Sequence, residues 1–204
     1  MLSAMLLVAA LGTNPVAAAL ERFDAVDSYR ATLHTWSDDG RQVVRFYYRK
    51  PGFVRMEFVE PHAGAVLVYS PLTGRVKLWP FGLGSFPELD LSPGNRLIRG
   101  PRGHTVDRSD IGELLRKAQQ LQRSGSQEVV GEEAVGERPA WRVAVTGAPG
   151  ASVDGVHRYD LWLAGDGLFP LKAESRDERQ RLLESTTMED VQLGVRFPDH
   201  FFDP

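Results

Sequence analysis

Cysteine is missing from all 204 residues of the chain. Its absence excludes a disulfide framework, a thiolate nucleophile and any zinc site built on cysteine ligands. It also leaves no thiol to which a lipid anchor could be attached. We therefore expect an exported form of this protein not to be tethered to a membrane by an acyl group of its own.

A marked excess of one charge is also missing, because 24 basic residues stand against 27 acidic ones and give a formal net charge of -3. Such a balance offers no electrostatic reason for binding a phosphate backbone. The short basic run at Arg96, Arg99 and Arg102 lacks the aromatic residues on which bases could stack. We expect no nucleic-acid partner. The hydrophobic share of 42% is ordinary for a globular protein and allows a sizeable core.

Recognisable catalytic and metal-binding motifs are lacking too. Gly84-Ser85 lacks the second glycine of a nucleophile elbow, and the acidic pairs Asp38-Asp39 and Glu132-Glu133 lie at turns, where solvated acids are common. We predict a non-enzymatic protein with no cofactor and no metal. The alternative of an unrecognised hydrolase would need a histidine in a cleft beside a carboxylate. None of the histidines has the spacing of a known metal motif: His34, His62, His104, His157 and His200.

The N-terminus has the features of an export signal. Leu2 to Leu11 is almost wholly apolar and has the length of a signal-peptide core, and the small residues Val16 to Ala19 follow it. We predict a signal peptide over residues 1–18, a periplasmic location and one mature domain over residues 19–204. A buried N-terminal helix is the alternative, because no Lys or Arg precedes Arg22. The run is too short to span a bilayer.

The remaining sequence alternates mainly between apolar and polar residues, which predicts β-strands with one buried face. Short turns join most of these segments, and short links favour antiparallel pairing. Leu20 to Val26 is predicted to be a short helix. A second helix is expected from Ile111 to Leu121, capped by Asp107 or Ser109 and ended by Gly125. The predicted strands cover residues 30–36, 44–49, 54–58, 65–69, 75–78, 127–130, 141–145, 159–163, 169–174 and 181–193.

These elements predict a fold that is mainly β with some α. An open antiparallel sheet of this length tends to curl, so we expect an incomplete β-barrel with an N-terminal helix. The concave side of a curled sheet is apolar and must be covered. The helix around Leu115 and the Gly- and Pro-rich segment from Phe81 to Ile98 are the candidates for that cover.

Several segments resemble the periplasmic outer-membrane lipoprotein carriers, the LolA-like family. Arg49 to Phe58, with the sequence RKPGFVRMEF, is similar to the family's basic-Pro motif. The similarity continues, in the family's order, through residues 64–69, 76–80, 163–172, 188–191 and 197–204. The resemblance thus covers nearly the whole predicted mature chain.

The resemblance implies a helical lid over an apolar hollow that binds acyl chains. It also implies that the protein carries lipoproteins or lipids toward the outer membrane, between membrane-bound donor and acceptor proteins. In the family, an arginine before the proline helps to close the lid. Lys50 occupies that position here, beside Arg49, so these two residues are the lid-latch candidates. An envelope stress sensor of the same fold, binding a partner protein, is the alternative. We expect a monomer.

A saturated acyl chain forms no hydrogen bonds, so its binding must come from burial, at about 0.8 kcal/mol per methylene. Any barrel or sandwich would bury the same apolar residues as core, which is the alternative interpretation. The lid is predicted to present Ile111, Leu114, Leu115 and Ala118. The predicted cavity is lined by Val44, Phe46, Tyr48, Val54, Met56, Phe58, Val76, Leu78, Val143, Tyr159 and Leu161.

Overall fold

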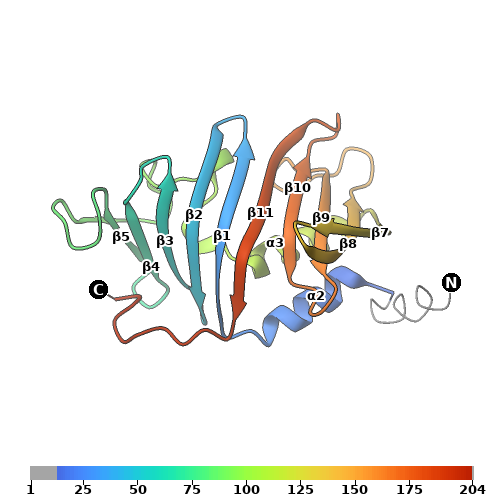
Figure 1. The fold of residues 1–204 in the computed structure, drawn as a ribbon. Helices are drawn as coiled ribbons and strands as arrows, with labels where there is room; N and C mark the ends of the chain where they lie inside the picture. The colour runs from blue at the N-terminus through green and yellow to red at the C-terminus, as the bar shows by residue number, and fades with distance from the viewer. Residues whose placement is uncertain (1–12, 204) are drawn as a thin grey trace. The chain divides into compact units, whose positions relative to one another are not determined.

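The computed structural model describes residues 13–203 of the chain (Figure 1). In this part of the chain, eleven strands form one open antiparallel sheet in the order β6-β5-β4-β3-β2-β1-β11-β10-β9-β8-β7. The predicted fold class is confirmed: mainly β with α, with an N-terminal helix and a second helix inserted between strands. The chain divides into two compact units. Unit 1 comprises residues up to 25 together with 111–185, and unit 2 comprises 26–110 with 186–204.

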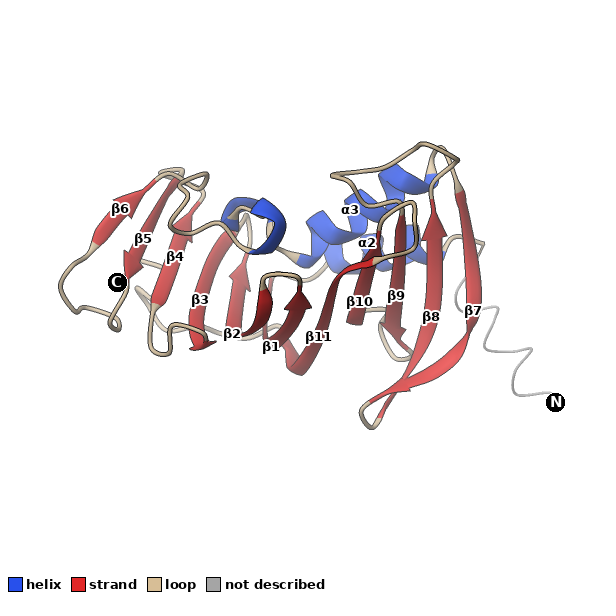
Figure 2. Cartoon of the chain, turned by 90° about the horizontal axis from the view of Figure 1, so that it is seen from above, coloured by secondary structure: helices blue, strands red, loops and turns tan. Residues whose placement is uncertain are grey.

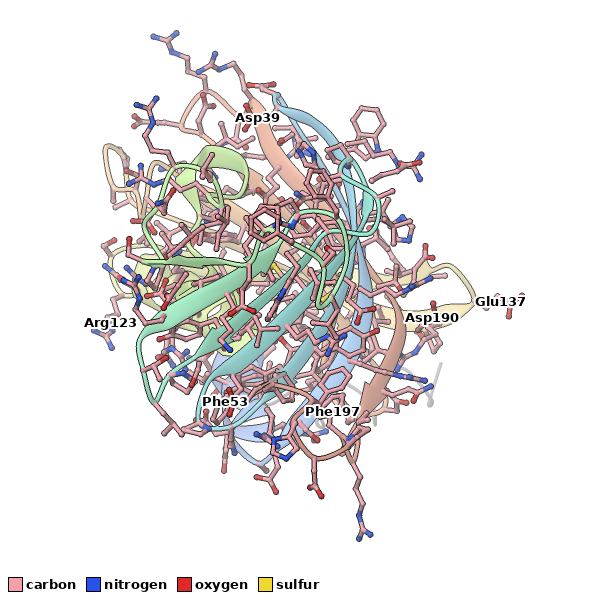
Figure 3. All side chains as sticks on the ribbon, turned by 90° about the vertical axis from the view of Figure 1, so that its left-hand side faces the viewer. Asp39, Phe53, Arg123, Glu137, Asp190 and Phe197 are labelled. Carbon is pink, nitrogen blue, oxygen red and sulfur yellow. The ribbon has the colours of Figure 1, made fainter. Side chains whose placement is uncertain are left out.

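Unit 2 contains an antiparallel meander whose strands are joined by short turns. Its strands are β1 (Ser28–Ser37), β2 (Gly40–Arg49), β3 (Phe53–Glu60), β4 (Val66–Ser70), β5 (Arg75–Trp79) and β6 (Leu89–Leu91), and β11 (Leu182–Leu193) enters it from residue 186. Asp39, at the β1–β2 turn, and Phe53, at the start of β3, mark opposite ends of these strands (Figure 3).

One face of unit 2, which we call the outer face, carries the C-terminal segment. Phe202 is buried there, 2% exposed, in a cluster with Val66, Val68 and Trp79. Other aromatic rings pack against this cluster; they are Tyr47, Phe53, Phe197 and Phe201. The aromatic C-terminus is therefore part of the core on this face.

Unit 1 places two helices against a sheet. The helices are α2 (Pro15–Asp24) and α3 (Ile111–Gln122), and the strands are β7 (Ser126–Val135), β8 (Arg138–Thr146), β9 (Arg158–Ala164) and β10 (Pro170–Arg176). The helices contact each other, and α3 also contacts β8 (Figure 2). Val16 of α2 and Leu115 of α3 are fully buried, as is Val143 of β8. Each of these three segments thus contributes a fully buried side chain to unit 1.

The beginning of α2 differs from the prediction. The helix starts at Pro15 instead of near Leu20, because Asn14 and Pro15 act as a start signal. The Asn14 side chain accepts a hydrogen bond from the Ala17 N–H at 3.0 Å, and Pro15 occupies the first turn, where its missing N–H costs nothing. The apolar run of the predicted signal peptide, Leu2 to Leu11, lies outside the described residues, whereas its predicted cleavage site after Ala18 lies inside α2.

The segment after β5 also differs from the prediction. It contains the three-residue strand β6, which pairs with β5, and two short 3-10 turns, η1 (Pro101–Gly103) and η2 (Val106–Arg108). Helix α3 begins directly after Asp110, so neither Asp107 nor Ser109 precedes it immediately, and the Ser109 hydroxyl instead donates to the Val106 carbonyl. The predicted end near Gly125 is confirmed, because α3 ends at Gln122 and the Gly125 N–H donates to the Gln122 carbonyl at 3.0 Å.

None of the helices in the described part of the chain is both long and apolar enough to cross a membrane.

Candidate functional site

The predicted cavity residues of unit 2 lie together on one face of its sheet, which we call the apolar face. The strand register fixes this arrangement: Phe46 lies opposite Met56, Met56 opposite Leu67, and Leu67 opposite Leu78. Because side chains on paired strands share a face, these residues form one apolar row across four strands. A second row runs through Tyr29, Tyr48, Val54, Tyr69, Val76 and Leu91, and Val44 pairs with Phe58 in a third.

The apolar face is only partly covered. Phe46 and Val76 are buried, at 1% and 0% exposure, whereas Met56, Phe58 and Leu78 keep part of their surface in solvent. Their incomplete burial distinguishes these side chains from ordinary core residues. Burying them against an apolar ligand would still release free energy, because the hydrophobic effect scales with the area removed from water.

The segment between β6 and α3 supplies cover within unit 2. Figure 2 shows a short helical turn over the strands β2 and β3. Val106 of η2 is 3% exposed, and Asp107 lies close enough to act on Tyr69 of the apolar face. Burial raises the pKa of the Tyr69 hydroxyl, and the negative charge of Asp107 raises it further. Asp107 thus places η2 beside the apolar face.

The predicted cavity residues of unit 1 have a different setting. Val143 and Leu161 are 0% exposed and pair with each other across β8 and β9, and Tyr159 is 5% exposed. They belong to the filled core of unit 1. Their contact with a ligand remains a prediction.

The predicted lid residues lie on α3 and are largely enclosed within unit 1. Ile111, Leu115 and Ala118 are buried, at 5%, 0% and 0% exposure, and Leu114 is partly exposed. The helix packs on α2 and β8. Opening of a lid made by α3 would have to expose these side chains or move them together with α2, and the lid role remains a prediction.

The two latch candidates make contacts inside unit 2. The Lys50 ammonium lies 3.7 Å from the Asp27 carboxylate. The Arg49 guanidinium lies over the rings of Phe53 and Phe202, at 4.8 and 4.9 Å from their centroids. Cation–π contacts of this kind hold the C-terminal segment on the outer face. A part in closing a lid stays a prediction for both residues.

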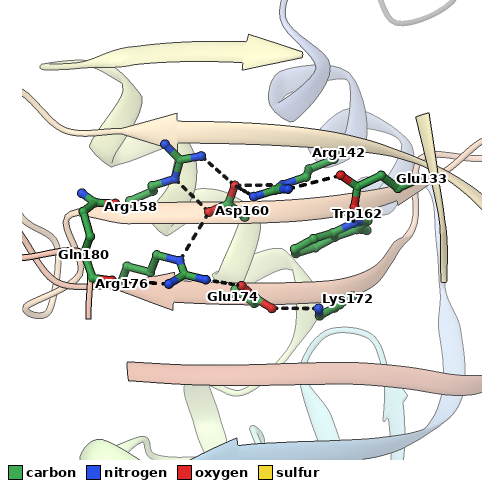
Figure 4. Close-up of polar contacts among 9 residues, drawn as sticks. All are labelled: Glu133, Arg142, Arg158, Asp160, Trp162, Lys172, Glu174, Arg176 and Gln180. Atoms are coloured by element: carbon green, nitrogen blue, oxygen red, sulfur yellow. Dashed lines mark hydrogen bonds and ion pairs between the residues drawn. The ribbon is translucent and has the colours of Figure 1, made fainter. Parts of the chain in front are cut away.

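Sequence reasoning missed a charged network on the face of unit 1 that points away from its helices (Figure 4). Asp160 has a fully buried side chain and pairs with Arg158 at 2.8 Å, with Arg142 at 3.1 Å and with Arg176 at 3.9 Å. Trp162 donates a hydrogen bond to Glu133 at 2.7 Å. The alternate positions of Arg158, Asp160 and Trp162 show that they share a face. Which residues of the neighbouring strands become their partners is determined by the strand register, which the sequence does not show.

The electrostatics of this network favour the charged form of Asp160. Burial by itself would raise the pKa of the carboxyl, but the hydrogen bonds and charges of Arg158 and Arg142 lower the pKa below its ordinary value. Glu174 behaves similarly, because Lys172 and Arg176 outweigh its burial and lower its pKa. The network is thus an internally satisfied arrangement of charges.

The described residues include no group of three or more His, Asp or Glu side chains that could hold a metal ion. His157 is buried, with Nδ1 2.8 Å from the Ala151 carbonyl oxygen, and has a structural hydrogen bond. His34 lies 3.3 Å from the carboxylate of Glu189, whose side chain is 59% exposed. The absence of an enzymatic activity stays a prediction.

No family model matches the sequence, and no curated protein matches it either. Solved structures do match it. An uncharacterized conserved protein from Thermus thermophilus aligns with a TM-score of 0.59 and 13% identity, covering 94% of each chain. The Mycobacterium tuberculosis lipoprotein LppX aligns with a TM-score of 0.54 and 12% identity, covering 90% of this chain and 96% of LppX.

Pseudomonas aeruginosa MucB, solved in complex with MucA, aligns with a TM-score of 0.55 and 20% identity, covering 91% of this chain. The match spans 60% of the other chain, so this protein corresponds to about three fifths of it. At these identities the similarity concerns the fold. The fold is thus shared with LppX and with the Thermus thermophilus protein.

Proposed function

We propose that this protein is a non-enzymatic carrier or chaperone of the bacterial cell envelope. In this proposal the apolar face of unit 2 binds acyl chains of a lipoprotein or a lipid, which the protein delivers toward the outer membrane. The observation that carries the proposal is the continuous apolar register across β1 to β6, where Met56, Phe58 and Leu78 remain partly exposed. A sheet face of this kind suits a ligand that offers only hydrocarbon.

The energetics are compatible with reversible binding. Burial of a chain of sixteen carbons contributes on the order of 12 kcal/mol, at about 0.8 kcal/mol per methylene. The loss of translational freedom and the ordering of the chain offset a large part of this gain. The flexible thioether of Met56 would adapt to chains of different shape, since methionine fills irregular apolar space well.

A periplasmic location is part of the proposal. It is supported by the apolar run from Leu2 to Leu11 in the sequence and by structural similarity to a protein described as a lipoprotein, LppX. The fold of α2 bears on how such a signal would be removed. A cut after Ala18 would remove Val16, which is buried in unit 1. A cut before Asn14 would instead leave α2 and its cap intact.

The direct experiment is an organic extract of protein purified from a bacterial envelope, analysed by mass spectrometry for copurified lipid. A binding assay with a fluorescent fatty acid then locates the site. We expect the double variant M56Q/L78Q to bind at least about tenfold more weakly, which corresponds to about 1.4 kcal/mol. L72Q is the matched control, because Leu72 is 79% exposed in the β4–β5 turn. A clean extract together with no saturable binding would contradict the proposal.

A second candidate function is that of an envelope sensor or adaptor that binds a partner protein. The structural similarity to MucB, which was solved with MucA, favours this alternative. Crosslinking in the envelope followed by a pull-down separates the two functions. One protein partner and no lipoprotein would support the sensor, whereas several lipoproteins crosslinked to the apolar face would support the carrier.

A further inference from the structure

A groove of about 360 Å³ lies on unit 2, apart from the apolar face. It runs along β1 and β2 and is bordered by β11, on which Figure 3 labels Asp190. We call it the Arg30–Arg45 groove. Its lining residues are Arg30, Ala31, Thr32, Arg45, Tyr47, Asp190 and Gln192.

The groove has an excess of positive charge. Within the described chain, Arg30 and Arg45 form no ion pair and donate no side-chain hydrogen bond. Asp190 is the acid that lines the groove, and it accepts a hydrogen bond from the Thr32 hydroxyl at 3.3 Å. Two guanidinium groups therefore face a single carboxylate. An arginine without a partner keeps all five of its N–H donors available to a ligand.

Glu57 lies opposite Arg45 in the strand register, but its carboxylate is bonded to other residues. It accepts hydrogen bonds from Arg55 at 2.7 and 3.0 Å and from the Tyr47 hydroxyl at 3.2 Å. Tyr47 is itself held in place by the C-terminal segment, because its ring makes edge contacts with Phe197 and Phe201 at 6.1 and 5.1 Å. Tyr47, on one wall of the groove, thus already has partners within unit 2.

The spacing of the two arginines suits an extended peptide. In the antiparallel register Arg30 lies opposite Tyr47 and Thr32 lies opposite Arg45, so the two arginines are diagonal neighbours on one face. Such neighbours lie roughly 7 to 8 Å apart. In an extended chain, side chains two residues apart project from the same side with a separation of about 6.7 Å. Two carboxylates at alternate positions would therefore meet both guanidinium groups, and a carboxylate pairs well with the planar fork of arginine.

We propose that the Arg30–Arg45 groove binds an acidic segment of a partner polypeptide in an extended conformation, with carboxylates at alternate positions. The segment lies across β1 and β2 and places one carboxylate on each arginine, while Gln192 and Tyr47 border it. This site is on a different face of the sheet from the proposed acyl-chain site. It does not depend on acyl binding, so each proposal can fail without the other.

The test uses fluorescence polarisation with synthetic peptides at physiological ionic strength. The probe is a labelled hexapeptide of alternating aspartate and serine. A peptide of the same composition with its aspartates contiguous tests the spacing, and inorganic phosphate tests binding of a simple anion. The double variant R30Q/R45Q removes both charges from the groove. The control R96Q/R179Q removes two charges from exposed arginines outside it.

We expect saturable binding of the alternating peptide that R30Q/R45Q weakens about tenfold and R96Q/R179Q leaves within about twofold. The fluorescent fatty acid should bind R30Q/R45Q as it binds the unmodified protein, which keeps the two proposals distinguishable. If both double variants weakened peptide binding equally, the binding would reflect general charge attraction, and the proposed peptide site would be wrong. The proposal would also be wrong if the alternating peptide showed no saturable binding or if the contiguous peptide bound equally well. Full competition by millimolar phosphate would contradict it too.

Discussion

The two units cover their sheet faces in different ways. In unit 1, two helices lie on the sheet, and Val143, Leu161 and Leu163 are 0% exposed beneath them. In unit 2, loops and two 3-10 turns are the cover found within the unit, and large apolar side chains such as Phe81 and Phe86 are 76% and 93% exposed. A pair of helices can fill a sheet face completely, whereas an irregular segment rich in Gly and Pro leaves apolar surface available.

Because of this difference, we expect apolar residues of unit 1 and unit 2 to have different roles. The apolar residues of unit 1 mainly provide stability, because a filled core gains free energy only from its own packing. Under the proposed function, burying the partly exposed residues of unit 2 against an apolar ligand would release further free energy. Substitutions in the two units should therefore differ in their cost to stability.

The largest effect is expected from shortening a core leucine in unit 1. Leu115 has no exposed surface, so L115A should lower the free energy of unfolding by about 3 to 4 kcal/mol, through lost burial and the cavity left behind. L78A on the apolar face of unit 2 should cost about 1 kcal/mol, because Leu78 is partly exposed already. Urea unfolding measures both. Equal losses would show that the two units are filled alike.

The second effect concerns the start of α2. A chain beginning at Ala19 lacks Val16, which is 0% exposed, the Asn14 cap, and the bond from the Val16 N–H to the Gln127 side chain at 3.3 Å. It should be about 3 kcal/mol less stable than a chain beginning at Thr13, from burial of one valine and one helix cap. Thermal unfolding followed by circular dichroism compares the two chains. Identical midpoints would mean that cleavage after Ala18 is harmless.

The third effect tests the charged network of unit 1. D160N leaves three arginines around an uncharged amide and should cost roughly 2 kcal/mol at neutral pH. The pKa of Asp160 in the folded state is lowered by its arginines, so its contribution to stability is fully present above the unfolded pKa of about 3.9 and is lost as the pH falls through the folded-state pKa.

D160N should therefore lose less stability than the unmodified protein between about pH 5 and pH 2. D166N is the control, because Asp166 pairs with Arg138 at an exposed site, with 81% of its side chain in solvent. A pH profile of D160N parallel to that of the unmodified protein would contradict an ionised, arginine-bound Asp160.

The smallest effect concerns the outer face of unit 2. The Arg55 guanidinium pairs with Glu57, donates to the Phe201 carbonyl at 3.1 Å and lies 4.3 Å from the Phe201 ring centroid. R55Q should cost about 1 kcal/mol and release the C-terminal segment to proteolysis. R41Q, which breaks an exposed pair with Glu60, is the control. Cleavage near Phe201 at the same rate in both variants would show that Arg55 does not hold this segment.

The sequence was sufficient to predict elements whose faces differ locally. In β2 and β3, apolar residues such as Phe46 and Met56 alternate with charged ones such as Arg45 and Glu57, so the strands and their apolar face could be recognised. Helix α3 was predictable from its apolar stripe. In contrast, β6 has three residues in a segment of Gly and Pro, and a strand that short has too few positions to show a period.

Features that depend on strand register could not be predicted from the sequence. The arginines around Asp160 come from three strands, and Arg30 and Arg45 meet across β1 and β2. Local periodicity shows which face a residue occupies but not which partner lies opposite. For the same reason the predicted cavity list combined Met56, on a partly open face, with Val143 and Leu161, in the filled core of unit 1. Alternation alone does not show what covers a face.

The most direct test follows the methyl groups of both units by NMR while palmitate is added to protein with labelled Met and Leu methyl groups. We expect the resonances of Met56 and Leu78 to shift in a saturable manner, while those of Leu115 and Leu161 stay within the line width. Shifts confined to Leu115 and Leu161, or no change at any of these four methyl groups, would contradict the claim that the apolar face of unit 2 takes the acyl chain.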